Sequence, residues 1–123
     1  MSKILVVEDS KFQRKMLTQL LGDNQFTVTS ARDGAEALEQ VKSTCPDLVV
    51  LDIIMPRVNG YEVCRRLKSN PQTKNVPIVF CSSQAGHADR YWGMKNGADA
   101  YVGKPFQAGE LLETVRQLLG SRC

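Results

Sequence analysis

The chain has 123 residues, of which 42% are hydrophobic and 24% charged, a balance typical of one globular domain with a single core. The 16 Lys and Arg residues barely exceed the 13 Asp and Glu residues, so the net charge of +3 does not indicate nucleic-acid binding. No apolar run approaches the roughly 20 residues needed to cross a bilayer. Because no signal peptide precedes the first expected strand, we expect a cytoplasmic protein without membrane insertion.

The cysteines are not spaced as metal ligands. They form neither a CxxC pair nor a zinc-like pattern, and no secretion signal accompanies them, so we interpret all four as reduced thiols. We expect two of them, Cys64 and Cys81, to pack as small apolar side chains. The other two are Cys45 and Cys123.

Short apolar runs alternate five times with segments of helical periodicity. Strands are expected at residues 3–7, 26–30, 47–52, 76–81 and 99–102. Helices are expected at residues 11–21, 33–41, 59–70, 88–96 and 111–120. This alternation predicts an α/β fold with a doubly wound, five-stranded parallel sheet and helices on both faces. The usual strand order for such a sheet is 2-1-3-4-5, with a switch point between the first and third strands.

Polar side chains follow four of the expected strands. The carboxyl ends of parallel strands meet at one edge of the sheet, where ligands bind at the switch point. We therefore predict that five side chains converge on one crevice. They are Glu8 and Asp9 after the first strand, Asp52 after the third, Ser82 after the fourth and Lys104 after the fifth.

This crevice predicts a magnesium site. Three crowded carboxylates repel one another, and one lysine offsets a single charge. Mg²⁺ takes oxygen ligands and would remove the excess. We predict Asp9 and Asp52 as direct ligands, joined by the backbone carbonyl of Ile54, with Glu8 acting through water.

The remaining groups suit a phosphoryl group. The Lys104 ammonium and the Ser82 hydroxyl can each bind one phosphoryl oxygen. Asp52, held by the metal, is then placed as the in-line nucleophile.

Seven short motifs lie at residues 4–10, 33–38, 52–56, 59–60, 77–79, 97–101 and 104–106. Through these motifs the chain resembles, over essentially its whole length, the CheY-like receiver domain of two-component response regulators. The resemblance implies that Asp52 accepts a phosphoryl group from a sensor histidine kinase or phosphotransfer protein, with Mg²⁺ at Glu8, Asp9 and Asp52. It also implies that the chain catalyses only its own phosphorylation and dephosphorylation, and that Tyr101 turns inward when Ser82 engages phosphate.

Two positions depart from the family's common pattern. Glu8 stands where many members carry Asp, so we expect function with altered metal affinity. Ser82 stands where Thr is common, and the hydroxyl is kept. The segment 91–98 is similar to stand-alone receivers of pilus-based motility and phototaxis systems.

We expect a single receiver domain over residues 1–123 with no output domain, so that output is a protein contact. The expected surface is the fourth helix with the fifth strand and last helix. Tyr91 and Trp92 are either partner-facing or part of the core.

Three alternatives remain open. A Mg²⁺-dependent phosphatase with an aspartate nucleophile would need a second carboxylate two residues later, where this chain has Ile54. A flavodoxin-like cofactor module would need a phosphate-binding first loop, which Glu8 and Asp9 would oppose. A phosphorylation-independent pseudo-receiver would normally lack one of the five groups, and none is missing.

Overall fold

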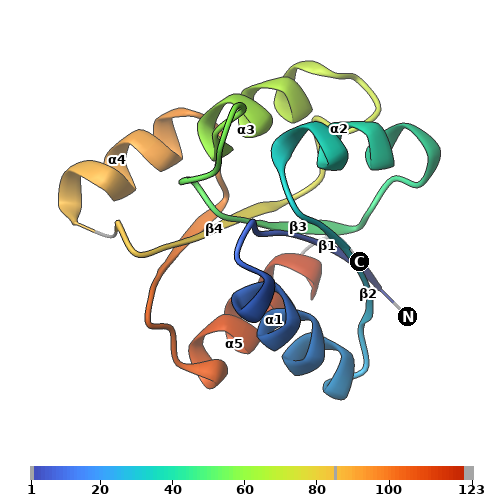
Figure 1. The fold of residues 1–123 in the computed structure, drawn as a ribbon, viewed down its shortest axis with the longest axis vertical. Coiled ribbons are helices and arrows are strands. Elements are labelled where there is room, and N and C mark those ends of the chain that lie inside the picture. The colour runs from blue at the N-terminus through green and yellow to red at the C-terminus, as the bar shows by residue number, and fades with distance from the viewer. Residues whose placement is uncertain (1, 85, 121–123) are drawn as a thin grey trace.

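The computed structural model describes residues 2–84 and 86–120, which fold as a parallel sheet between two helical layers (Figure 1). The strands lie in the order β2-β1-β3-β4-β5, so the predicted fold class and strand order are confirmed. The strands are β1 (Lys3–Val7), β2 (Thr27–Ala31), β3 (Leu48–Leu51), β4 (Ile78–Ser82) and β5 (Ala100–Gly103). The helices are α1 (Lys11–Asp23), α2 (Gly34–Ser43), α3 (Gly60–Ser69), α4 (His87–Lys95) and α5 (Ala108–Gly120).

The sheet divides the core into two clusters. Helices α1 and α5 cover one face, and α2, α3 and α4 cover the other (Figure 1). All four residues of β3 are buried, as its unbroken apolar run predicts, because the strand lies in the middle of the sheet. Strand β2 lies at an edge and alternates exposed with partly buried residues until Ala31. The two faces therefore follow directly from the hydrophobic pattern.

Side-chain caps fix the starts of the helices on both faces. The Asp33 carboxylate accepts a hydrogen bond from the backbone N–H of Glu36 at 2.8 Å and starts α2. The Asn59 side chain accepts from the N–H of Glu62 at 3.0 Å and starts α3. Asp and Asn are favoured at this position because their side chains satisfy a free N–H of the first helical turn.

Helix α4 exposes its two large aromatic side chains to solvent, which decides between the two alternatives that the sequence left open. Tyr91 and Trp92 are 56% and 57% exposed, so the interpretation of these two residues as core is wrong. The buried residue of this helix is Gly93. A glycine contributes no apolar side chain to a periodicity, and this explains why the sequence pattern left Tyr91 and Trp92 open between core and surface.

Two cysteines pack in the core as expected. Cys64 and Cys81 are buried, and burial raises the pKa of their thiols to about 11 and about 12. Cys45 is exposed, and all three are free thiols. Cys123 lies outside the described residues. Within the described ranges, no helix has both the length and the apolar character to span a bilayer.

The start of α3 packs tightly against the segment that carries Asp52. The Gly60 N–H donates to the carbonyl of Ile53 at 2.8 Å. A Cβ atom at position 60 would lie only 2.3 Å from the backbone oxygen of Asp52. A side chain here would therefore push α3 away from the end of β3.

We predict that Gly60→Ala lowers the free energy of unfolding by about 2 kcal/mol, because the added methyl group overlaps backbone atoms. Gly22→Ala is the matched control, since a Cβ there meets nothing within 4 Å. We expect it to leave stability unchanged or raise it by up to about 1 kcal/mol, as a helical glycine replaced by alanine should. Urea unfolding of the three proteins measures both effects, and equal stability of the two variants would contradict this account.

Candidate functional site

The acidic groups meet at the carboxyl edge of the sheet. Carboxylate oxygens of Glu8, Asp9 and Asp52 all lie within 4.8 Å of one another. Glu8 and Asp52 are buried, whereas Asp9 is exposed. An open pocket of about 540 Å³ lies over them, and its lining includes Ile54, Ser83 and Lys104. The site is thus a concave, acidic surface in which Asp9 is the exposed carboxylate.

Backbone hydrogen bonds extend the sheet into the loops that carry these side chains. The N–H of Asp52 donates to the carbonyl of Val7 at 3.0 Å, and the N–H of Glu8 donates to Ala31 at 3.1 Å. The N–H of Lys104 donates to the carbonyl of Ser82 at 2.9 Å. The side chains of the site are therefore attached to the rigid ladder and not to free loops.

Lys104 supplies the cation of the site. Its ammonium donates to one carboxylate oxygen of Glu8 and to the side-chain oxygen of Gln13, and its nitrogen lies 3.8 Å from Asp52 Oδ2. The other Glu8 oxygen accepts from the N–H of Ser10 at 3.1 Å. Both oxygens of Glu8 are thus engaged by the protein. The Lys104–Pro105 peptide bond is cis.

Burial and crowding act together on Asp52. Burial, and then the neighbouring charge of Glu8, raise the pKa of Asp52 from 3.8 to about 6, against the opposing effect of Lys104. The lysine charge therefore only partly compensates the cluster.

Ser82 and Tyr101 lie behind the pocket. The Ser82 hydroxyl is fully buried and accepts from the N–H of Gln84 at 3.2 Å, while the neighbouring Ser83 lines the pocket. The Tyr101 ring is buried against Phe80, and its hydroxyl donates to the carbonyl of Gln84. Burial raises the pKa of Tyr101 to about 12. The side chains of Ser82 and Tyr101 therefore both form hydrogen bonds with Gln84, which follows β4.

Helix α4 forms the outer wall of the Tyr101 site. The Arg90 guanidinium lies 5.4 Å from the centre of the Tyr101 ring and donates to the Tyr101 carbonyl at 3.0 Å. Gly93 leaves the space that the ring fills, because a Cβ there would lie 2.8 Å from Tyr101 Cδ2. The inward position of Tyr101 thus depends on a glycine inside a helix.

Comparison with known proteins agrees with this geometry. The model of the response regulator receiver domain matches residues 4–116. The chain belongs to the response regulator receiver family. It is therefore a receiver domain of two-component signalling, as the sequence motifs predicted.

Relatives and solved structures agree on the receiver domain and differ in length. Response regulator MprA of Mycobacterium ulcerans is 44% identical over 95% of this chain and 50% of that protein, and MprA of Mycobacterium avium is 42% identical with the same coverage. The chain thus spans about half the length of the curated relatives it matches. The receiver domain of Francisella response regulator 1452 has a TM-score of 0.93, 29% identity and full coverage of both chains. Chemotaxis protein CheY4 of Vibrio cholerae has a TM-score of 0.91 and 30% identity, covering 96% of this chain and 98% of its own. The expected absence of an output domain stays a prediction.

The donor set fits the cation that this family commonly uses. Mg²⁺ takes oxygen ligands, and here three carboxylates of the described residues lie within reach of one ion. Asp9 and Asp52 would hold it directly, while Glu8 already bonds Lys104 and Ser10 and would act through water. Ile54 lines the same pocket, where its carbonyl is the predicted further ligand.

The raised pKa of Asp52 predicts a pH-dependent stability in the absence of divalent cations. The folded-state pKa lies above the ordinary value, so ionisation costs the folded state stability as pH rises from about 4 to about 6. Asp52→Asn removes this cost. In a chelator, it should stabilise the fold at pH 7 by on the order of 2 kcal/mol and have little effect at pH 4. Denaturant unfolding at both pH values is the measurement, with exposed Asp23→Asn as control; a gain that is the same at both would contradict the prediction.

We predict that Gly93→Ala displaces the Tyr101 ring from its inward position, because the added methyl group overlaps the ring. Nuclear Overhauser contacts between the rings of Tyr101 and Phe80 should weaken, and the Tyr101 hydroxyl should lose protection from solvent. Gly109→Ala, at a position with nothing within 4 Å, is the control. Ring contacts that persist unchanged in Gly93→Ala would show that α4 does not hold the tyrosine in place.

Proposed function

We propose that this receiver domain is a phosphoacceptor switch in which Asp52 takes a phosphoryl group from a phosphohistidine. The observation that supports it best is the position of Asp52, buried beside two further carboxylates and 3.8 Å from the Lys104 ammonium. A group that receives a phosphoryl unit needs charge neutralisation on its oxygens and a fixed direction of approach. Lys104 supplies one positive charge, a cation held by the carboxylates would supply more, and the backbone hydrogen bond of Asp52 to Val7 fixes the position of the acceptor.

The proposed step moves the phosphoryl group from a donor imidazole to Asp52. An oxygen of the Asp52 carboxylate attacks phosphorus, the new O–P bond forms, and the P–N bond to the donor imidazole breaks. The imidazole nitrogen keeps the electron pair and takes a proton. A bound Mg²⁺ would neutralise charge on the phosphoryl oxygens. The Lys104 ammonium binds one of these oxygens, and the Ser82 hydroxyl, after a small movement out of the core, binds another.

The proposed reactions are confined to phosphorylation and dephosphorylation of the chain's own Asp52. Water attacking the phosphoryl group of Asp52 would release phosphate and regenerate the carboxylate. A phosphatase acting on separate substrates would need a general acid two residues after Asp52, and that position holds the half-exposed, apolar Ile54. Ile54 therefore favours the proposal that Asp52 loses its phosphoryl group slowly, and it argues against the alternative that the chain hydrolyses small phosphate esters.

The proposed output surface is helix α4 with β5 and α5. Tyr91, Trp92 and Met94 of α4 are large, exposed apolar side chains. Arg90 connects this surface to Tyr101 by the two contacts described above. A shift of Tyr101 would thus alter the surface, so phosphorylation is proposed to change a protein contact made there.

The proposed cellular setting is a motility or taxis system. A cytoplasmic role in motility or taxis is supported by the similarity of residues 91–98 to motility receivers and by a structural neighbour described as a chemotaxis protein. Capture of protein partners with and without beryllofluoride, which mimics a phosphoryl group on aspartate, would identify the output.

We predict that acetyl phosphate with Mg²⁺ adds one phosphoryl group to the protein and that Asp52→Ala abolishes the addition. Intact mass spectrometry measures it, and a chelator should prevent it. Asp23→Ala, which removes an exposed carboxylate at the end of α1, is the matched control and should label normally. Labelling that survives unchanged in Asp52→Ala would place the acceptor elsewhere, and an unlabelled parent protein would favour a pseudo-receiver.

A further inference from the structure

The Lys104 ammonium is held by a residue outside the five predicted site residues. An ammonium group offers three N–H donors. Here two of them meet the oxygens of Glu8 and Gln13, while Asp52 Oδ2 lies further away at 3.8 Å. The lysine side chain is only 12% exposed, so water can replace these acceptors only in part. Gln13 therefore contributes directly to where the cation lies.

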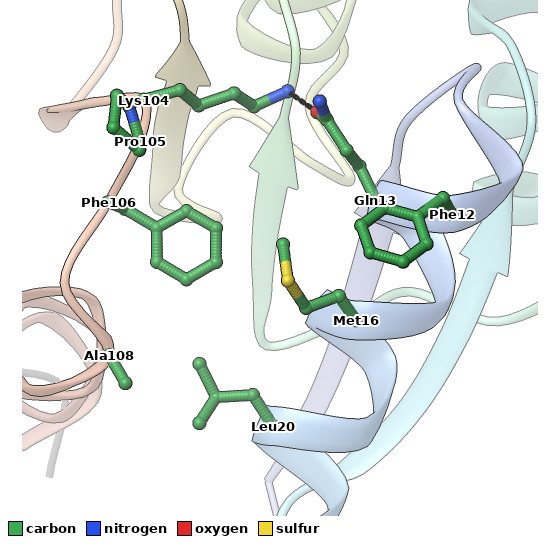
Figure 2. A pocket seen from close by; sticks show the side chains of 8 residues that line it. All are labelled: Phe12, Gln13, Met16, Leu20, Lys104, Pro105, Phe106 and Ala108. Atoms are coloured by element: carbon green, nitrogen blue, oxygen red, sulfur yellow. Dashed lines mark hydrogen bonds between the residues drawn. The ribbon is translucent and has the colours of Figure 1, made fainter.

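Gln13 stands at the boundary between two different surfaces. It lines the acidic pocket and also an apolar groove between α1 and the start of α5 (Figure 2). The groove is lined by Phe12, Gln13, Met16, Leu20, Lys104, Pro105, Phe106 and Ala108. Apart from Gln13 and Lys104 themselves, these side chains are apolar. On its groove side the ammonium thus finds one side-chain acceptor among the lining residues, the Gln13 amide.

The local structure of α1 fixes the direction of this amide. Ser10 caps the helix, and the N–H of Gln13 donates to its hydroxyl oxygen at 3.3 Å, which places Gln13 in the first turn. From there the side chain extends across the end of the groove to the lysine nitrogen (Figure 2). The contact joins residues 91 positions apart in sequence, so it couples α1 to the loop after β5.

The two acceptors of Lys104 differ in a way that matters for phosphoryl transfer. Glu8 is charged and belongs to the acidic cluster, so a cation bound there would compete with the lysine for it. The Gln13 amide is neutral and competes less for a hard cation. It can hold the ammonium beside Asp52 while the interactions of Glu8 change.

We propose that Gln13 is a positioning residue that holds the Lys104 ammonium beside Asp52, ready to bind an oxygen of the incoming phosphoryl group. The consequence for phosphoryl binding rests on the proposed function. The anchoring of the ammonium does not, because it follows from the contacts of the protein alone.

Two measurements on the intact chain test this inference. Gln13→Met keeps the length of the side chain and removes the acceptor. The Lys104 ammonium resonance, assigned by its loss in Lys104→Gln, reports anchoring through proton exchange with water. Beryllofluoride binding in the presence of Mg²⁺ reports the phosphoryl site. In Gln13→Met we expect exchange to be about tenfold faster and beryllofluoride affinity about tenfold weaker, since a hydrogen bond to a charged group is lost.

Two further variants separate this role from a general effect on α1. Gln13→Glu retains an oxygen at the same distance from the backbone and should restore slow exchange. Gln19→Met, an equivalent change at an exposed position of α1, should match the parent protein in both measurements.

Unchanged beryllofluoride affinity in Gln13→Met overturns the positioning role, and so does an equal loss in Gln19→Met. If the parent protein itself does not bind beryllofluoride, the proposed function fails. The exchange rate of the Lys104 ammonium then decides alone whether Gln13 anchors it: faster exchange in Gln13→Met supports the anchoring, and unchanged exchange overturns it.

Discussion

Electrostatic repulsion among three carboxylates held at one edge of a parallel sheet is the constraint on which the site depends. The backbone positions of Asp52 and Glu8 are fixed at this edge, because their N–H groups donate to the carbonyls of Val7 and Ala31. Two of them are also buried, which makes their charges more costly than they would be in water. The energy of this arrangement is released by any group that brings positive charge to the cluster, and this makes the site responsive.

Lys104 neutralises the negative charge of the three carboxylates only in part. It donates to Glu8 and Gln13 and lies near Asp52 without a hydrogen bond to it. In the proposed transfer, a lysine bonded tightly to Asp52 would neutralise the nucleophile and leave the incoming phosphoryl group without a partner. Burial, and then the charge of Glu8, raise the pKa of Asp52 although Lys104 lowers it, so the ammonium does not offset both effects. The acidic cluster thus retains excess negative charge that a divalent cation would neutralise.

The sequence contained enough information for the fold and for most of the residues that meet at the site. The apolar run before Asp52 and the caps at Asp33 and Asn59 are local signals, and the alternation of segments specifies the sheet. Gln13 and Gly93 were missed because their roles come from tertiary contacts. An amide on the first turn of a helix and a glycine inside another carry no periodic signal. The same limit explains why Tyr91 and Trp92 were left open between core and surface. It also explains why the sequence did not reveal that Ser83 lines the pocket while Ser82 is buried.

The segment after β4 connects the acidic site to the exposed face of α4. Ser82 and Tyr101 both bond Gln84, one through its N–H and the other through its carbonyl. If Ser82 moves to bind a phosphoryl oxygen, the Gln84 N–H loses its acceptor and the segment must rearrange. Tyr101 then loses or changes its own partner, and Arg90 transmits the change to the exposed face of α4. In the proposed switch, the free energy of this shift can be no larger than the difference in phosphoryl affinity between the two arrangements. The strength of the proposed switch would then depend on how well Lys104 and Ser82 bind the phosphoryl oxygens.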